Sequence, residues 1–180
     1  MTENYPWYSV AGDDELRQGD ILFQCPVMVP TTSLPDDASN ESVLLDADVL
    51  TYDVVIMSQS CDLENEKLDL VLVCPHWSFE EFSGEQEYFK SRQGKLDLQR
   101  GNVPGYFLLN RFEQNDLMPD IRVVDFRNVY SLPFQFLKRF CGQNSPRLRL
   151  LPPYREHLSQ AFARFFMRVG LPVPVDLNRK

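Results

Sequence analysis

One short segment of the sequence combines residue types that could do chemistry. Ser58-Gln59-Ser60-Cys61-Asp62 follows an apolar, β-branched run at 54–57, which we expect to be a strand buried on both faces. The end of a buried strand is a place where a rigid scaffold presents reactive side chains. A thiol beside a carboxylate at such a position makes Cys61 and Asp62 candidate catalytic residues.

A cysteine nucleophile needs a base, and the chain has two histidines. In a hairpin, His76 would lie about seven residues, or roughly 20 Å, from Cys61. This distance leaves His157 as the base, with Asp62 or Asp20 orienting it, and predicts a thiol-dependent enzyme. In the alternative, Cys61 is a small apolar filler at the sheet edge and His157 lies on a solvated helix face. The sequence leaves both readings open.

Cys74 and His76 flank Pro75 and are both residue types that bind zinc. With Cys61 they would form a site only if all three converged within about 2.3 Å of one ion. The predicted hairpin separates them, and the four cysteines include no CxxC pair. We therefore expect neither a metal nor another cofactor.

Arginines gather near the C-terminal part of an otherwise acidic chain. The chain carries 26 acidic and 18 basic residues and a formal net charge of −8, which disfavours a general nucleic-acid binder. A local basic region could contact an anionic ligand, an acidic partner or the protein's own carboxylates. The expected binding residues combine the strand-end segment with these arginines: Ser58, Gln59, Ser60, Arg149, Arg155, Arg164 and Arg168.

Several strands are needed to position these residues. A turn followed by a short strand is expected at 18–26, stopping at Pro26, and residues 31–42 are typical of a surface loop. The apolar runs at 54–57 and 70–74 are joined by a polar connection and predict an antiparallel hairpin. Two further strands are expected at 105–112 and 121–126.

Helices are predicted in the second half. Ser78 and Glu81 have the spacing of a capping box, so we expect helical structure to about residue 99, interrupted at Gly84 and Gly94. A short helix is expected at 133–140. The last helix should begin after Pro153 and end before 170, with an apolar stripe formed by Tyr154, Leu158, Phe162, Phe165 and Val169.

Composition sets the class of protein. Hydrophobic residues make up 43% of 180 residues and aromatic residues 12%, which is enough for one folded domain over residues 1–180. No apolar run approaches the roughly 20 residues that cross a bilayer, and residues 1–7 lack the pattern of a secretory signal. We expect a cytoplasmic protein with reduced cysteines and no membrane contact.

The first half resembles the toxins of the MazF and PemK type, which are SH3-like barrels acting on RNA. The resemblance rests on Gly19-Asp20-Ile21, on the strand at 54–57 ending in Ser58, and on the strand at 71–74 ending at Pro75. The family's catalytic arginine is replaced here within Tyr52-Asp53, and its threonine within His76-Trp77. From Trp77 onward the chain is also similar to a bacterial family of unknown function.

Together these observations predict an α+β fold: a small, mainly antiparallel, barrel-like (SH3-like) sheet with packed helices and a C-terminal amphipathic helix. The function we expect first is a non-enzymatic interaction module with a protein partner, contacted through the Cys61 segment and the edge of the last helix. The resemblance implies an accessory component of a bacterial toxin or defence system. The alternatives are the thiol-dependent enzyme and a diverged ribonuclease or RNA-binding barrel. The oligomeric state cannot be read from the sequence.

Overall fold

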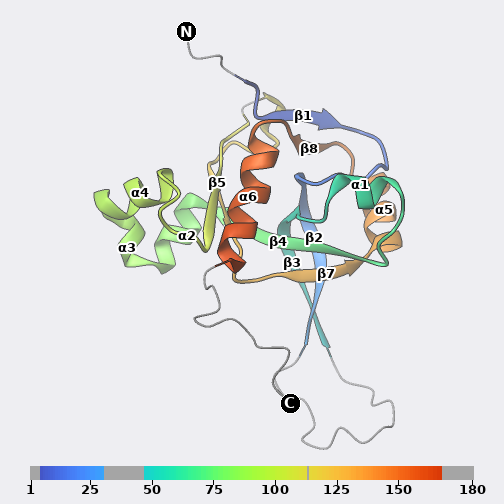
Figure 1. Ribbon diagram of the computed structural model, residues 1–180, viewed down its shortest axis with the longest axis horizontal. Helices are drawn as coiled ribbons and strands as arrows, with labels where there is room; N and C mark the ends of the chain where they lie inside the picture. Colours follow the sequence, from blue (N-terminus) through green and yellow to red (C-terminus); the bar gives the residue numbers. More distant parts are fainter. Residues whose placement is uncertain (1–4, 31–46, 113, 168–180) are drawn as a thin grey trace, which may run out of the picture.

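The computed structural model describes residues 5–30, 47–112 and 114–167, and its centre is an antiparallel sheet (Figure 1). Eight strands form this sheet in the order β1-β8-β2-β3-β4-β6-β5, with β7 paired to β4. The strands are β1 (Tyr8–Ala11), β2 (Asp20–Pro30), β3 (Ala47–Ile56), β4 (Leu70–Ser78), β5 (Tyr106–Leu109), β6 (Arg122–Asp125), β7 (Tyr130–Pro133) and β8 (Arg147–Leu150). The α+β class and the antiparallel sheet are therefore confirmed.

The sheet is not closed into a barrel, so the expected barrel-like closure is wrong. The physical reason lies in β4. Its first half pairs with β7 and its last residues, His76–Ser78, pair with β6. This leads β6 and β5 away from β1, which stands at the other end of the strand order.

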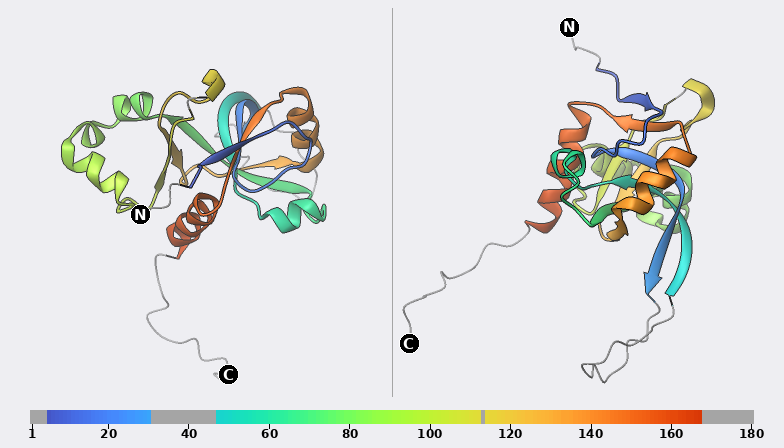
Figure 2. Two further views of the ribbon diagram at one scale, coloured as in Figure 1. Left: turned by 90° about the horizontal axis from the view of Figure 1, so that it is seen from above. Right: turned by 90° about the vertical axis from the view of Figure 1, so that its right-hand side faces the viewer.

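The helices lie in three places around the sheet (Figure 2). Three short helices, α2 (Phe79–Glu85), α3 (Glu87–Lys90) and α4 (Arg92–Gln99), form a lobe beside β5. At the opposite end lie α1 (Ser60–Glu64) and α5 (Phe134–Gln143), and α6 (Tyr154–Phe166) runs along the side between them. A 3-10 turn, η1, spans Gln114–Asp116. None of the described helices is long and apolar enough to cross a membrane.

Three apolar clusters hold these layers together. One joins α1 and α5 to the sheet around Leu63 and Leu137, and the third packs the α2–α4 lobe around Phe82. The middle cluster anchors α6 through Leu158, which is fully buried, and through Phe162 against Phe126. The predicted apolar stripe of the last helix is thus confirmed as far as the described residues reach; Val169 lies outside them.

The structure differs from two predictions about the strands. The antiparallel pairing of 54–57 with 70–74 is confirmed, with Val55 opposite Cys74, but the connection contains α1, so Cys61 lies in a helix. The strand expected to stop at Pro26 continues to Pro30. Proline is tolerated there because β8 pairs with β2 only at Asp20 and Ile21, leaving the later part of β2 an edge. The loop predicted at 31–42 lies outside the described residues.

One predicted helix start is confirmed, and the predicted helix breaks are not. Ser78 and Glu81 form the predicted capping box at the start of α2. The breaks, however, fall at Gln86 and Ser91 and not at the two glycines. Gly94 lies within α4, where a Cβ atom would collide with the carbonyl of Tyr88. It therefore permits close packing of α4 on α3 and does not end a helix.

Candidate functional site

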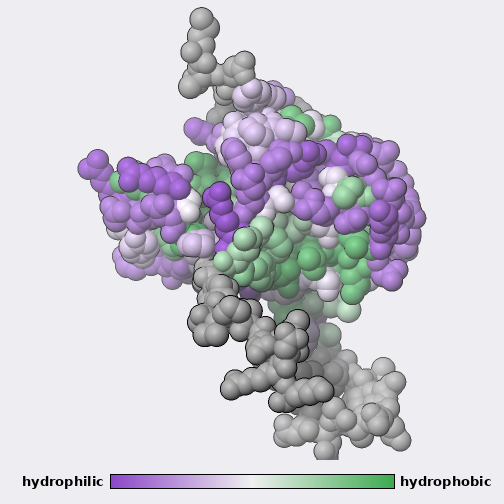
Figure 3. All heavy atoms as spheres, viewed as in Figure 1, coloured by the Kyte–Doolittle hydropathy of each residue, from purple (hydrophilic) through white to green (hydrophobic). Residues whose placement is uncertain are grey.

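A groove of about 580 Å³ runs along the outer edge of β5, and we call it the β5 groove. Its floor is formed by consecutive residues of that strand, Tyr106–Leu109. One wall is α6 and the other is the end of α4. Figure 3 shows the α2–α4 lobe on the left, next to the side chains over α6. A groove of this volume is within the range of binding sites.

Part of the backbone of β5 is open toward this groove; the N–H of Tyr106 is not, because it donates to the carbonyl of Val103 at 3.1 Å. β5 is the last in the order of the described strands, and among these it has a partner on one side only. The amide of Phe126 donates to the carbonyl of Gly105 at 2.9 Å, which fixes the alternation of the antiparallel ladder. Phe107 and Leu109 therefore direct their backbone groups toward β6. Leu108 directs its N–H and C=O away from β6, and among the described residues these groups have no hydrogen-bond partner.

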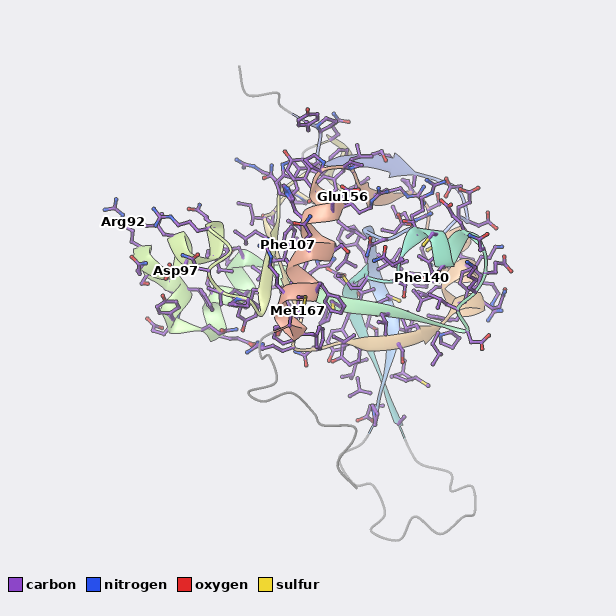
Figure 4. All side chains as sticks on the ribbon, viewed as in Figure 1. Arg92, Asp97, Phe107, Phe140, Glu156 and Met167 are labelled. Atoms are coloured by element: carbon purple, nitrogen blue, oxygen red, sulfur yellow. The ribbon has the colours of Figure 1, made fainter. Side chains whose placement is uncertain are left out.

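The residues of α6 that line the groove are regularly spaced along the helix. Tyr154, His157, Ala161 and Arg164 line the groove at the three- and four-residue spacing that places side chains on one helix face. Phe107 of β5 packs on the same apolar cluster as α6 (Figure 4). Trp7 stacks on Tyr154 with ring centroids 3.7 Å apart, which adds an aromatic surface to this wall.

The opposite wall follows from how α4 ends. Gly101 adopts a left-handed conformation with φ +67°, and its N–H donates to Leu98 while that of Asn102 donates to Asp97. This pair of bonds is the Schellman motif, which stops a helix with a glycine. It places Arg100 and Gly101 in the groove wall.

The charges in the β5 groove have one sign. Two exposed arginines, Arg100 and Arg164, line it, and no carboxylate does. Asp97 lies within electrostatic reach of Arg100. Within the described part of the chain neither arginine forms an ion pair. The groove is thus a positive region on a chain of net charge −8, suited to an anionic or acidic partner.

Cys61 lies on the other side of α6. It is exposed and borders a separate hollow of about 340 Å³, the Cys61 cleft, together with Arg155, Glu156 and Ser159. His157 lines the β5 groove and not this cleft. The structure therefore brings Cys61 near Arg155, whose guanidinium pairs with Glu156 at 2.7 Å. It does not bring Cys61 and His157 into one hollow.

The other residues of the strand-end segment have structural contacts. The Ser58 hydroxyl accepts a hydrogen bond from the Leu72 amide at 2.9 Å, and Ser60 accepts one from the Gln18 amide at 3.1 Å. Gln59 is the N-terminal cap position of α1, and Asp62 is in the first turn of that helix. Gln59, Ser60 and Cys61 still line the Cys61 cleft.

Asp20 and Arg149 belong to a buried ion-pair network that we call the Asp20 cluster. Asp20 is completely buried and accepts from Arg149 Nε at 2.6 Å and from Arg147 Nε at 2.8 Å. Arg147 is 2% exposed and also pairs with Asp13 at 2.9 Å. The Asp20 cluster ties β8 to β2. Asp20 is thus held by arginines and does not reach His157 in the β5 groove.

Of the predicted arginines, only Arg164 lines the β5 groove; Arg168 lies outside the described residues. Sequence reasoning missed Arg100, Trp7 and Leu108, since their roles depend on β5 being an end strand. Over residues 5–30, 47–112 and 114–167, no group of three His, Cys, Asp or Glu residues is arranged to hold a metal ion.

Comparison of the chain with protein-family models finds no match, and a search among curated proteins finds none either.

Proposed function

We propose that this protein is an interaction module that binds an extended segment of a partner protein in the β5 groove. The segment would add one strand to the sheet at β5. The observation that carries this proposal is the open backbone of Leu108 between two walls. Addition of a strand to an exposed sheet edge is a known mode of peptide recognition, in which backbone hydrogen bonds supply affinity and flanking side chains supply specificity.

The groove also supports a preference among segments. Phe107 and Tyr154 offer apolar and aromatic surface, whereas Arg100 and Arg164 offer positive charge. A segment with alternating apolar and acidic side chains would match this pattern, because successive side chains of a strand point to opposite faces. Exposed edges usually need protection against unwanted pairing. The walls formed by α4 and α6 restrict access to β5 to a single strand.

The thiol-dependent enzyme is supported less well. Its nucleophile and base, Cys61 and His157, line different hollows. The further proposal that the partner belongs to a bacterial toxin or defence system rests on the resemblance described above.

The proposal is tested by selecting linear peptides of random sequence, displayed on phage, against the immobilised protein. We expect extended, acidic peptides to be enriched, and their binding to be lost in Leu108→Pro. Proline removes an N–H that faces the groove and no bond to β6, and proline is tolerated at such edge positions. Phe107→Pro is the matched control, because it removes a ladder bond to β6 and should unfold β5.

A folded Leu108→Pro variant that binds the selected peptides as tightly as the parent protein would contradict strand addition. Failure to select any peptide would contradict the β5 groove as a peptide site.

A further inference from the structure

A second hollow lies where four strands meet, away from the β5 groove. It measures about 330 Å³ and is lined almost entirely by polar side chains. Gln24 from β2, Asp53 from β3, His76 from β4 and Arg122 from β6 contribute to it. We call this hollow the polar bowl. It is built on strands of the sheet and therefore has a rigid base.

His76 is the most unusual residue of the polar bowl. Its side chain is 1% exposed, yet neither ring nitrogen has a hydrogen-bond partner among the described residues. Burial, with a smaller effect of the Arg122 charge, lowers the pKa of His76 to about 3. The imidazole is therefore neutral near pH 7 and offers one donor and one acceptor. Buried polar groups are rarely left without partners, so this one calls for an explanation.

Arg122 adds a further unsatisfied donor. Its Nε atom is buried and without a partner in the described part of the chain, and its guanidinium lies over the Phe23 ring at 5.7 Å. The same ring meets His76 edge-on at 5.9 Å. Arg122 and His76 are thus held by one aromatic side chain at the base of the polar bowl.

The carboxylate of Asp53 is held in place by Gln24, whose backbone is strained. Gln24 has a φ of 53° at the bulge of β2, and from there its backbone N–H donates to Asp53 at 2.9 Å. Asp53 in turn pairs with Arg122 at 3.3 Å. Backbone strain of this kind is often found at functional sites. The charges of Asp53 and Arg122 offset each other. The unsatisfied nitrogens of His76 and Arg122 therefore carry no uncompensated charge.

We propose that the polar bowl binds a small, uncharged, planar molecule whose edge presents a carbonyl oxygen beside an N–H group. The carbonyl would accept from Arg122 Nε, and the N–H would donate to the unprotonated ring nitrogen of His76. Tyr52 and Trp77 also border the bowl, with the Tyr52 ring stacked on Tyr130 and Trp77 packed against the cluster around Phe82. Glu81 and Asp120 at the rim repel anions. Primary carboxamides and oxo-nucleobases share this edge.

The test uses Trp77 fluorescence in a Trp7→Phe background, which leaves one tryptophan, located in the polar bowl. Nicotinamide represents the carboxamides, and uridine and inosine represent the nucleobases. Nicotinate is the matched control, because it keeps the ring and replaces the amide with a carboxylate. We expect saturable binding of nicotinamide or of the nucleosides, and the stronger of the two identifies the source. Nicotinate should bind at least roughly tenfold more weakly.

Two variants in this background connect binding to the named atoms. His76→Phe removes both ring nitrogens and retains the contact with Phe23, and Arg122→Lys retains the charge beside Asp53 and removes Nε. Each should weaken binding by roughly tenfold, whereas Arg139→Lys, at an exposed position of α5 outside both hollows, should leave this binding unchanged. The proposal is overturned if none of the probes saturates the signal, if nicotinate binds as well as nicotinamide, or if a folded His76→Phe or Arg122→Lys variant retains full affinity.

Discussion

Two groups of arginines in this protein look alike in sequence and differ completely in the structure. In the Asp20 cluster, Arg147 and Arg149 are 2% and 13% exposed and are bound to a carboxylate that is entirely buried. In the β5 groove, Arg100 and Arg164 are exposed and have no ion pair within the described residues. The first group holds two strands together, and the second is exposed to solvent.

The two groups of arginines show that residue type alone does not decide the role of a basic cluster. What decides it is whether the topology brings a carboxylate alongside. β8 lies next to β2, so Arg149 is directly opposite Asp20 in the ladder. Among the described residues no strand lies beside the free edge of β5, so Arg100 and Arg164 have no carboxylate opposite them in a ladder. The predictions below test this contrast, beginning with the largest expected effect.

Asp20→Asn should destabilise the protein by about 3–5 kcal/mol. The substitution removes the buried partner of Arg147 and leaves it only the half-exposed Asp13 carboxylate, which is more costly than losing an exposed pair. Urea denaturation gives the free energy of unfolding. Asp13→Asn is the matched control, since the Asp13 side chain is 48% exposed, and its effect should stay below about 1 kcal/mol. Equal effects of the two variants would show that the Asp20 cluster is not the buried anchor described here.

Leu158→Ala should lower the free energy of unfolding by about 2–5 kcal/mol. Leu158 is the fully buried residue by which α6 packs on the sheet, and its truncation leaves a cavity. Gln160→Ala, on the exposed part of the same helix, should change stability by less than about 0.5 kcal/mol. Thermal and urea denaturation of both variants separate the anchoring face of α6 from its groove face. Similar losses in the two variants would remove that distinction.

His76 should make the protein sensitive to acid. The pKa of His76 is lowered to about 3 in the folded state against an ordinary value of about 6.5. Between these values the unfolded state binds the proton and the folded state does not, so stability falls as the pH falls.

Between pH 6.5 and pH 4.5, the parent protein should therefore lose about 2 kcal/mol more than His76→Phe. Denaturation of both proteins at the two pH values measures this difference. Parallel losses would mean that His76 titrates alike in the folded and unfolded states.

Arg164→Glu should have the smallest effect on stability, within about 0.5 kcal/mol, because its side chain is exposed. Its effect should be on binding: peptides selected on the parent protein should bind more weakly, and their affinity should depend less on salt. Arg139→Glu, an exposed arginine on α5, is the matched control. If both variants weaken binding alike, the effect is one of net charge and not of the β5 groove.

Local features of the fold were predictable from the sequence, and distant pairings were not. The capping box at Ser78 and the hairpin around Val55 depend on neighbouring residues and were found as expected. Arg147 and Asp20 are 127 positions apart, and nothing near either residue indicates the pairing. The sheet was likewise expected to close, because the branching of β4 between β7 and β6 leaves no local pattern.

The candidate site was predictable only in part. Arg164 and His157 could be placed on one flank of the last helix by their spacing, and both line the β5 groove. The chemistry of Cys61 makes it a candidate in the sequence, but α1 places it in a different hollow, the Cys61 cleft. The open edge of β5 is a property of strand order and could not be read from residues 106–109 alone.

Amide hydrogen exchange of β5, followed residue by residue by NMR, tests the central claim most directly. In the free protein the Leu108 amide should exchange much faster than those of Phe107 and Leu109, which bond to β6. With a saturating selected peptide, the Leu108 amide should become protected while its two neighbours change little. A Leu108 amide that is already protected in the free protein, or that stays unprotected in the complex, would contradict strand addition at β5.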